Sequence, residues 1–151
     1  MKPIVIGIGN RWRRDDGVGH RVVDELEGRL PESVELTMLD GEPARLVSTW
    51  RGRPWALVID AVQAGAPPGT IHRLDGMSLS DEPRPSPSSH GAGLHAAVAL
   101  GRAIGQLPDA LTIVGVEPED VGHGEGLSDP VAGVFDQVLT IIEEEVRTRC
   151  A

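Results

Sequence analysis

Cysteine and aromatic residues are scarce in this sequence. Its 151 residues include one cysteine and no tyrosine, and aromatic residues make up only 3%. The cysteine, Cys150, stands beside the end of the chain, where it has no partner for an internal disulfide and where a frayed backbone would not position a nucleophile. We therefore expect neither a disulfide nor a cysteine nucleophile.

Long apolar runs are also missing. No stretch approaches the roughly 20 apolar residues that span a bilayer. Met1-Lys2-Pro3 leads directly into a predicted strand, without the features of a signal peptide. We expect a cytoplasmic protein that does not bind membranes, and a length of 151 residues suits one domain over residues 1–151.

Basic charge is the third feature in short supply. The formal net charge is −9, from 14 Lys and Arg against 23 Asp and Glu. The deficit is concentrated near the carboxyl end of the chain, because residues 108–151 hold 2 basic and 10 acidic residues. This balance argues against nucleic acid as the partner.

Strand-like and helix-like patterns alternate along the chain. Short runs of Val, Ile and Leu indicate buried strands, whereas apolar residues at helical spacing indicate amphipathic helices. Three prolines within residues 81–89 predict a loop there. The alternation predicts an α/β fold, with a mostly parallel sheet and helices on both faces. We expect strands at about 3–9, 34–39, 55–59, 69–74 and 111–116, and helices at about 17–29, 43–50, 93–104 and 131–146.

Two adjacent carboxylates follow the first predicted strand. Gly7 and Gly9 begin like a dinucleotide fingerprint, but the third glycine position is Trp12, and Asp15 and Asp16 would repel a pyrophosphate at the start of the helix. One of the two aspartates can cap that helix. The other is then available for chemistry at the carboxyl edge of the sheet, where open α/β sheets bind ligands.

Three residues are candidates for one site at this edge. Asp16 follows the first strand, Asp60 ends the central one, and His90 opens a helix after the proline-rich loop. Two carboxylates and one imidazole suit zinc, nickel or iron(II), with positions left open for other ligands. The alternatives are that Asp60 caps a turn and that His90 is an ordinary helix residue.

Other residues near this edge have competing interpretations. Of the remaining histidines, His20 and His95 fall on helix patterns and are expected to be surface or packing residues. His123 lies in a glycine-rich loop that could approach the site, and His72 falls on a predicted strand.

The loop before Asp15 carries its own ambiguity. The basic cluster Arg11, Arg13 and Arg14 is either a self-neutralising loop or a clamp for a partner's carboxylate. We expect Trp12, between them, to cap the core, and contact with a substrate is the alternative.

At these residues the chain resembles the hydrogenase maturation endopeptidases, which process the large subunit of nickel–iron hydrogenases. The resemblance rests on an ordered set of motifs that runs nearly from end to end. These motifs are Val5-Ile6-Gly7-Ile8-Gly9-Asn10, Asp15-Asp16-Gly17-Val18-Gly19, Leu39-Asp40-Gly41, Val58-Ile59-Asp60-Ala61, Pro68-Gly69-Thr70, Ser89-His90-Gly91-Ala92-Gly93-Leu94, Leu111 to Glu119 and Gly126-Leu127-Ser128.

The resemblance implies a three-layer α/β/α sandwich around a twisted, mainly parallel sheet of about five strands. It implies that Asp16, Asp60 and His90 bind nickel, and that Asp40-Gly41 belongs to a loop used for substrate recognition or cleavage. At position 16 the family accepts Glu or Asp. Glu42-Pro43 departs from the glycine and threonine often found there, which indicates altered substrate handling or a different hydrogenase subtype.

The implied substrate is a large-subunit precursor that already holds nickel and still carries a C-terminal extension. The family is classified as aspartic-type, and either the metal or a carboxylate, Asp16 or Asp40, would activate water. We expect the nickel to come with the substrate, the isolated protein to hold no metal, and the protein to be a monomer. A non-proteolytic nickel-binding chaperone and a nucleotide-dependent enzyme are the alternatives. The sequence contains neither the Gly-x-Ser-x-Gly motif of serine hydrolases nor the His-Glu-x-x-His motif of zinc proteases.

Overall fold

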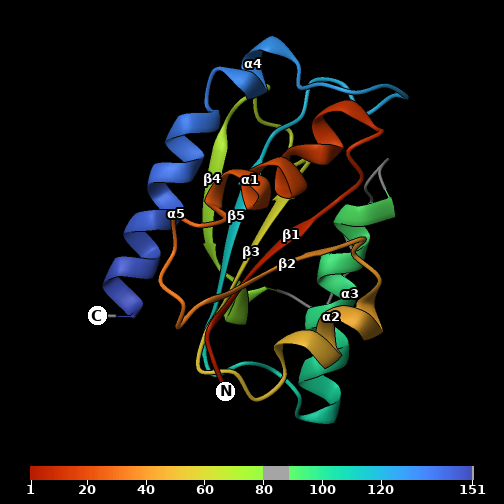
Figure 1. Cartoon of the computed structure of the whole chain (residues 1–151). Helices are drawn as coiled ribbons and strands as arrows, with labels where there is room; N and C mark the ends of the chain where they lie inside the picture. The colour runs from red at the N-terminus through yellow and green to blue at the C-terminus, as the bar shows by residue number, and fades with distance from the viewer. Residues whose placement is uncertain (80–88, 151) are drawn as a thin grey trace.

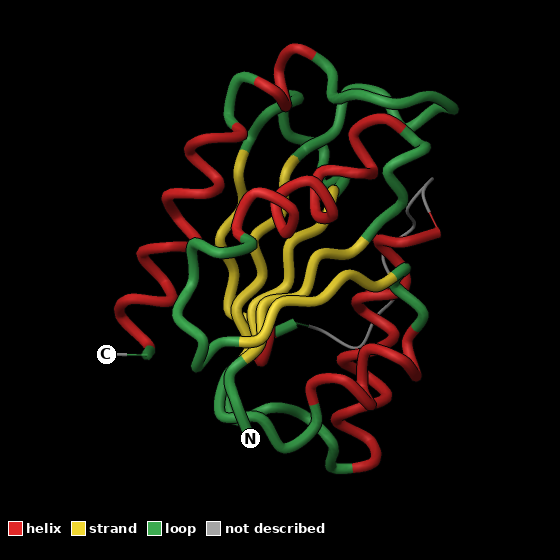
Figure 2. Tube along the Cα trace, viewed as in Figure 1, coloured by secondary structure: helices red, strands yellow, loops and turns green. Residues whose placement is uncertain are grey.

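Five strands and the helices that cover them form a layered α/β structure (Figures 1 and 2). The computed structural model describes residues 1–79 and 89–150, with the backbone alone for residues 89–92. The strands are β1 (Ile4–Ile8), β2 (Glu35–Leu39), β3 (Ala56–Ala61), β4 (Ile71–Asp75) and β5 (Leu111–Val116). The helices are α1 (Val18–Leu26), α2 (Pro43–Trp50), α3 (Ser89–Ile104), α4 (Asp129–Ala132) and α5 (Phe135–Arg149), with 3-10 turns η1 (Arg14–Gly17) and η2 (Gly76–Ser78).

The sheet has the strand order β2-β1-β3-β5-β4. All neighbouring strands are parallel except β4, which pairs antiparallel with β5 at one edge. Every residue of β1, β3 and β5 is buried, as expected for strands that are covered on both faces. The expected α/β sandwich with a mainly parallel sheet is thus confirmed.

Helices cover both faces of the sheet, with α1 and α5 on one face and α2 and α3 on the other (Figure 1). One hydrophobic cluster lies on each face. In β1, Val5 packs toward α1 and α5, whereas Ile4, Ile6 and Ile8 pack toward α2 and α3. The same alternation runs through β3, where Ala56 and Val58 belong to the cluster of α2 and α3. Burial on both sides of the sheet fixes the register of the strands and hence the residues that reach its carboxyl edge.

The elements differ most from the expected boundaries at three helices. The helix expected at 93–104 begins four residues earlier, at Ser89. The first helix ends at Leu26, because Gly28 takes a left-handed φ of 78° that favours glycine. The expected helix 131–146 is two helices, α4 and α5, with the break at Gly133, a poor helix former. In contrast, 43–50 and 111–116 form as predicted.

Several expectations concern parts or properties that the fold does not test. The loop expected at 81–89 lies outside the described residues, apart from Ser89 in α3. Across residues 1–79 and 89–150, no helix has the length and apolar character needed to cross a membrane. The single domain, the cytoplasmic location, the monomeric state and the absence of nucleic-acid binding stay predictions.

Candidate active site

The carboxyl ends of three neighbouring strands place the candidate residues at one edge of the sheet. The parallel register sets Leu39 of β2 opposite Ile8 of β1, and Ile59 of β3 opposite Gly7. Asp40 therefore follows β2 at the level where Asp16 follows β1, and Asp60 lies at the end of β3. The parallel pairing of β1 and β3 agrees with the expectation that Asp16 and Asp60 lie at the same edge of the sheet, and Asp40 follows β2 at this edge as well. That Asp16, Asp60 and His90 form one site stays a prediction.

Asp16 is buried against the end of β1. It lies in the turn η1, fully excluded from solvent, and its backbone oxygen accepts a hydrogen bond from the Asn10 N–H at 3.2 Å. Gly9 has a φ of 141°, and a Cβ there would overlap the backbone oxygen of Asp16. Glycine at position 9 thus allows the main chain of Asp16 to approach closely. This packing explains the glycine without a bound dinucleotide.

Asp15 has a different role from its neighbour. Its carboxylate accepts hydrogen bonds from the backbone N–H groups of Glu119, Asp120 and Ser128 and from the Ser128 hydroxyl, at 2.7–3.0 Å. It therefore binds the loop after β5 to the turn that carries Asp16. The expectation that one aspartate caps the first helix is wrong, because α1 has no side-chain cap hydrogen bond and its N-cap is Gly17.

Asp60 is a buried carboxyl group beside a second one. Its side chain is fully buried, and among the described residues neither of its oxygens has a hydrogen-bond partner. Burial raises its pKa well above the usual value, the nearby charge of Asp16 raises it further, and the backbone N–H of Ala61 opposes this in part. Alternation along β3 places Asp60 on the face that α3 covers, together with Val58.

This pair of carboxyl groups fits a divalent cation. A cation of charge two would offset both the desolvation of Asp60 and its repulsion from Asp16, and oxygen ligands together with one imidazole suit nickel or zinc. His90 lies in the first turn of α3, and the position of its side chain lies outside the described residues. Among the side chains that the structure does describe, no three of His, Cys, Asp or Glu form a metal cluster.

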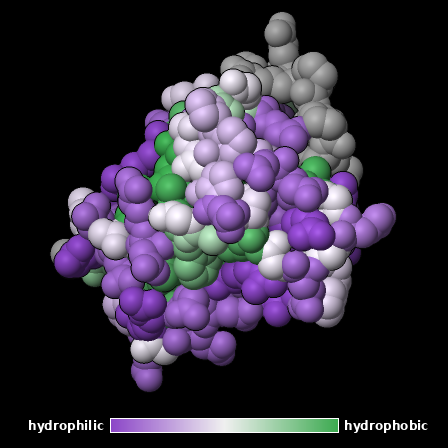
Figure 3. Space-filling model, turned by 90° about the horizontal axis from the view of Figure 1, so that it is seen from above, coloured by the Kyte–Doolittle hydropathy of each residue, from purple (hydrophilic) through white to green (hydrophobic). Residues whose placement is uncertain are grey.

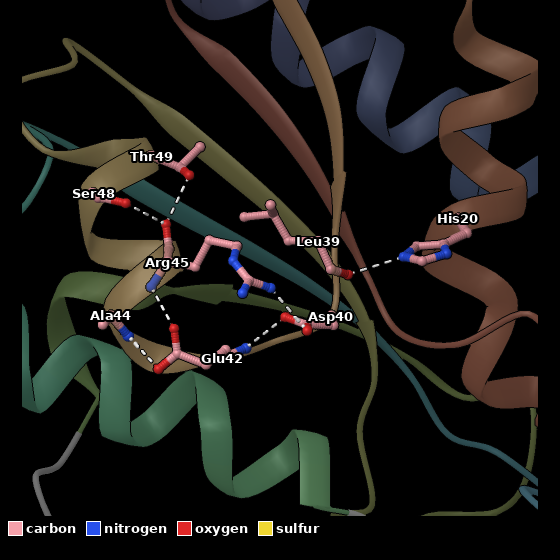
Figure 4. A network of polar contacts seen from close by, with 8 residues as sticks. All are labelled: His20, Leu39, Asp40, Glu42, Ala44, Arg45, Ser48 and Thr49. Carbon is pink, nitrogen blue, oxygen red and sulfur yellow. Dashed lines mark hydrogen bonds and ion pairs between the residues drawn. The ribbon is translucent and has the colours of Figure 1, made fainter.

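Asp40 is exposed and held by its own loop (Figure 4). Its carboxylate accepts from the backbone N–H of Glu42 at 3.1 Å and from the guanidinium of Arg45 at 2.9 Å. The Glu42 hydrogen bond and then the Arg45 contact lower the pKa of Asp40, with desolvation opposing them. Glu42 in turn caps α2 by accepting from the N–H groups of Ala44 and Arg45. The departure Glu42-Pro43 therefore starts a helix.

The Asp40 loop contacts the start of α3. Gly41 has a φ of 94°, and a Cβ on Gly93 would overlap the carbonyl oxygen of Gly41. His90 stands one turn before Gly93 on the same helix. Glycine at position 93 thus lets the helix that begins with His90 approach the loop that begins with Asp40.

Several other predictions about this edge are settled by contacts. His20 donates to the Leu39 carbonyl at 2.9 Å, which confirms it as a satisfied packing residue (Figure 4). Arg11 pairs with Asp24 at 2.9 Å and Arg14 with Asp120 at 3.3 Å, so two of the three arginines are neutralised by the protein's own side chains. These pairs favour the self-neutralising loop over the clamp.

Trp12 overturns an expectation. Its side chain is 61% exposed, so it does not cap the core. The reason is that the backbone of residues 10–16 folds into a closed turn above the sheet, which carries the indole outward.

Glu117 was not singled out from the sequence, and its partner His72 was named there only as one of the competing histidines. The buried carboxylate of Glu117 accepts from the N–H groups of Ala64 and Ala66 and pairs with His72 at 2.8 Å. Together they close the loop between β3 and β4. Glu117 stands directly after β5, as Asp60 stands at the end of β3, and that position was the available signal.

Comparison with known proteins agrees with this geometry. The sequence model of the HycI family, described as hydrogenase maturation protease, matches residues 20–145. The hydrogenase 2 maturation protease of Escherichia coli (strain K12) is 34% identical over 158 residues, covering 95% of this chain and 92% of that protein. The hydrogenase expression/formation protein HupD of Thiocapsa roseopersicina is 34% identical over 134 residues, and the match spans 84% of this chain but 59% of that relative.

A solved structure shows the same architecture. The hydrogenase maturating endopeptidase HybD from E. coli superposes with a TM-score of 0.82 at 29% identity, over 98% of this chain and 93% of that one. The similarity thus includes both the sequence and the whole fold.

Proposed function

The chain belongs to the hydrogenase maturation protease family, and on that premise we propose that it removes a C-terminal extension from the precursor of a nickel–iron hydrogenase large subunit, after nickel has been inserted. Family membership supports a protease that acts on hydrogenase precursors. The order of events, with nickel first and cleavage second, is the part that the proposal adds.

The buried pair Asp16 and Asp60 carries this proposal. The side chain of Asp60 is excluded from solvent, and its pKa is raised by burial and by the charge of Asp16, so its ionised form destabilises the fold unless a cation offsets the charge. Nickel held by the precursor supplies such a cation, and His90, at the start of α3, adds a nitrogen ligand. The protease then recognises its substrate by the metal that the substrate contains, and it needs no metal of its own.

In this proposal, Asp40 does not activate the attacking water. Asp40 remains ionised because its pKa is lowered, but a carboxylate that Glu42 and Arg45 already engage is a weak general base. We propose that Asp40 instead maintains the conformation of the loop that contacts the substrate. Nickel acting as a Lewis acid on the scissile carbonyl, or Asp16 acting on water, remains for the chemical step.

The test is the intact mass of a cognate large-subunit precursor after incubation with the protein, with nickel present and absent. We expect loss of a C-terminal fragment only from the nickel-loaded precursor. Asp16→Asn and His90→Ala should abolish this loss, whereas Asp136→Asn, an exposed acid on α5, should cleave like the wild type.

Three results would contradict the proposal in different ways. Confirmed binding without any change in mass would favour the chaperone. Cleavage that ignores nickel would keep the protease and remove the metal-recognition role of Asp16, Asp60 and His90. Thermal stabilisation by a nucleotide, without an effect of nickel, would favour the nucleotide-dependent alternative.

A further inference from the structure

An exposed tryptophan stands next to the candidate site. Trp12 is 61% exposed, whereas the two other tryptophans of the chain, Trp50 and Trp55, are 0% and 3% exposed. A large aromatic side chain kept in water gains nothing for folding, and in protein interfaces tryptophan is enriched among the residues that contribute most to affinity.

The backbone around Trp12 is fixed by a second loop. The N–H of Trp12 donates to the Asn10 side chain at 2.9 Å, and its carbonyl accepts from the N–H of Gly124 at 2.9 Å. Arg14 donates from its N–H to the Gly124 carbonyl, and the Arg13 side chain to the carbonyl of Val121. We call the two paired segments, residues 10–14 and 121–125, the Trp12 platform. The indole thus projects from a preorganised backbone, which lowers the entropy lost on binding.

The same turn connects the platform to Asp16. The Asp16 N–H donates to the Arg13 carbonyl at 3.0 Å, the Arg13 N–H donates to the Asn10 carbonyl, and the Asn10 N–H donates to the Asp16 carbonyl. The platform and Asp16 thus belong to one hydrogen-bonded turn, so a polypeptide bound at this edge of the sheet lies close to the platform. This continuity assigns the occupant, because a protease site needs its polypeptide substrate next to it.

Charge on the platform and around it selects the chemistry of the occupant. The loop after β5 presents four exposed acids, Glu119, Asp120, Glu125 and Asp129. Arg14 of the platform pairs with Asp120 and Arg11 pairs with Asp24, so the other three acids outnumber the one remaining platform arginine, Arg13. Seen from above, the molecule shows many hydrophilic residues, with a band of neutral and hydrophobic ones between them (Figure 3). An aromatic ring with surrounding carboxylates suits a basic segment, because Lys and Arg stack on indole while their charge is complemented.

We propose that the Trp12 platform is the docking surface for the precursor, and that the indole contacts a basic segment of that polypeptide. This inference rests on the proposed function and adds the surface, separate from the metal-binding residues, that determines substrate affinity. Docking and cleavage are then separable, since Trp12 contributes to KM and the Asp16 site to kcat.

Steady-state cleavage of the nickel-loaded precursor provides the first test. Trp12→Ala should raise KM about 10- to 100-fold with little change in kcat, and Trp12→Phe should restore most of the affinity. Ile104→Ala, at the far end of α3, removes a comparably exposed apolar side chain and should leave KM unchanged. Raising the salt concentration should raise the wild-type KM, because the contacts are between opposite charges.

Fluorine NMR of protein labelled with 5-fluorotryptophan provides the second test, since an unlabelled precursor contributes no signal. Three resonances are expected, and Trp12→Phe assigns one of them. Adding the precursor should move the Trp12 resonance and leave those of buried Trp50 and Trp55 in place.

The outcomes separate the two proposals. An unchanged KM in Trp12→Ala, or an unmoved Trp12 resonance in a bound complex, overturns the docking surface and leaves the protease intact. A moved resonance without cleavage keeps the docking surface and overturns the proposed function. A resonance that shifts with the concentration of the labelled protein alone assigns Trp12 to self-association instead, and a KM independent of salt overturns the basic character of the segment.

Discussion

Asp15 and Ser128 are joined by two hydrogen bonds across 113 residues of sequence. The backbone N–H of Ser128 donates to one carboxylate oxygen of Asp15 and its hydroxyl to the other, each at 2.7 Å. The N–H groups of Glu119 and Asp120 complete the set on the same carboxylate. The buried side chain of Asp15 thus holds the loop after β5 against the turn that carries Asp16. Asp15 has a structural role directly beside the candidate active site.

Asp15→Asn should destabilise the fold strongly. An amide has one acceptor oxygen, and its NH2 group would face a backbone donor that the carboxylate now accepts. We expect the free energy of unfolding to fall by about 2–4 kcal/mol, as for other broken contacts of a buried charge, measured by urea denaturation. Ser128→Ala removes only the hydroxyl donor and should lower it by about 1 kcal/mol. Equal effects of the two substitutions would argue against this account.

Asp60→Asn should stabilise the protein when a chelator is present. The folded state raises the pKa of Asp60, so folding favours the protonated form, and the wild type loses stability as the pH rises from the usual value of 3.8 through the raised folded pKa. Below that window both proteins should be equally stable. Above it the variant should gain at least about 1 kcal/mol, because one pKa unit corresponds to about 1.4 kcal/mol.

The check is a urea titration of both proteins at a series of pH values. A constant difference between them would show that the carboxyl of Asp60 does not titrate differently on folding. The Asp60→Asn variant should fail to cleave the precursor, because substitutions that stabilise a protein at an active-site residue typically reduce its activity.

The edge of the sheet was predictable from the sequence because the information is local. Runs of Val, Ile and Leu mark β1, β3 and β5, and a parallel sheet brings their carboxyl ends together, so Asp60 and the turn before α1 had to converge. The roles within that edge depend on partners far along the chain. Asp15 accepts from residues 104 to 113 positions away, and no periodicity encodes such a contact.

Trp12 illustrates a second kind of failure. An aromatic residue after a buried strand favours a core position when burial alone is considered. Its exposure follows from the hydrogen bonds that fold residues 10–16 into a turn and pair them with Gly124, a contact 112 residues away. Residues that break the burial rule are expected at functional sites, which is why the exception is informative.

Asp40→Asn and Asp40→Ala should behave differently. The asparagine oxygen can still accept from the Glu42 N–H, whereas alanine loses both that bond and the Arg45 contact. We expect cleavage to fall less than about threefold in Asp40→Asn and more than about tenfold in Asp40→Ala. If Asp40 were instead the general base, both variants would lose about 100-fold or more.

The pH profile of cleavage gives independent information on the same residue. Because the pKa of Asp40 is lowered from its usual value of 3.8, Asp40 stays ionised throughout the neutral range. A loss of activity between pH 5 and pH 7 must then come from another group. Asp40→Asn should leave the position of that loss unchanged, and a displaced acid limb would contradict the assignment.

Gly93→Ala tests the approach of α3 to the Asp40 loop. Its new methyl group would overlap the carbonyl oxygen of Gly41, which is backbone and cannot rotate away, so the first turn of α3 must move. We expect the free energy of unfolding to fall by about 1–3 kcal/mol and cleavage to fall tenfold or more, because His90 moves with that turn. Ala96→Gly weakens the same helix by about 1 kcal/mol at an exposed position and should cleave normally. If both variants lost activity in proportion to their loss of stability, the spacing between α3 and the Asp40 loop would matter for folding alone. If only Gly93→Ala lost activity, this spacing would determine the geometry of the site.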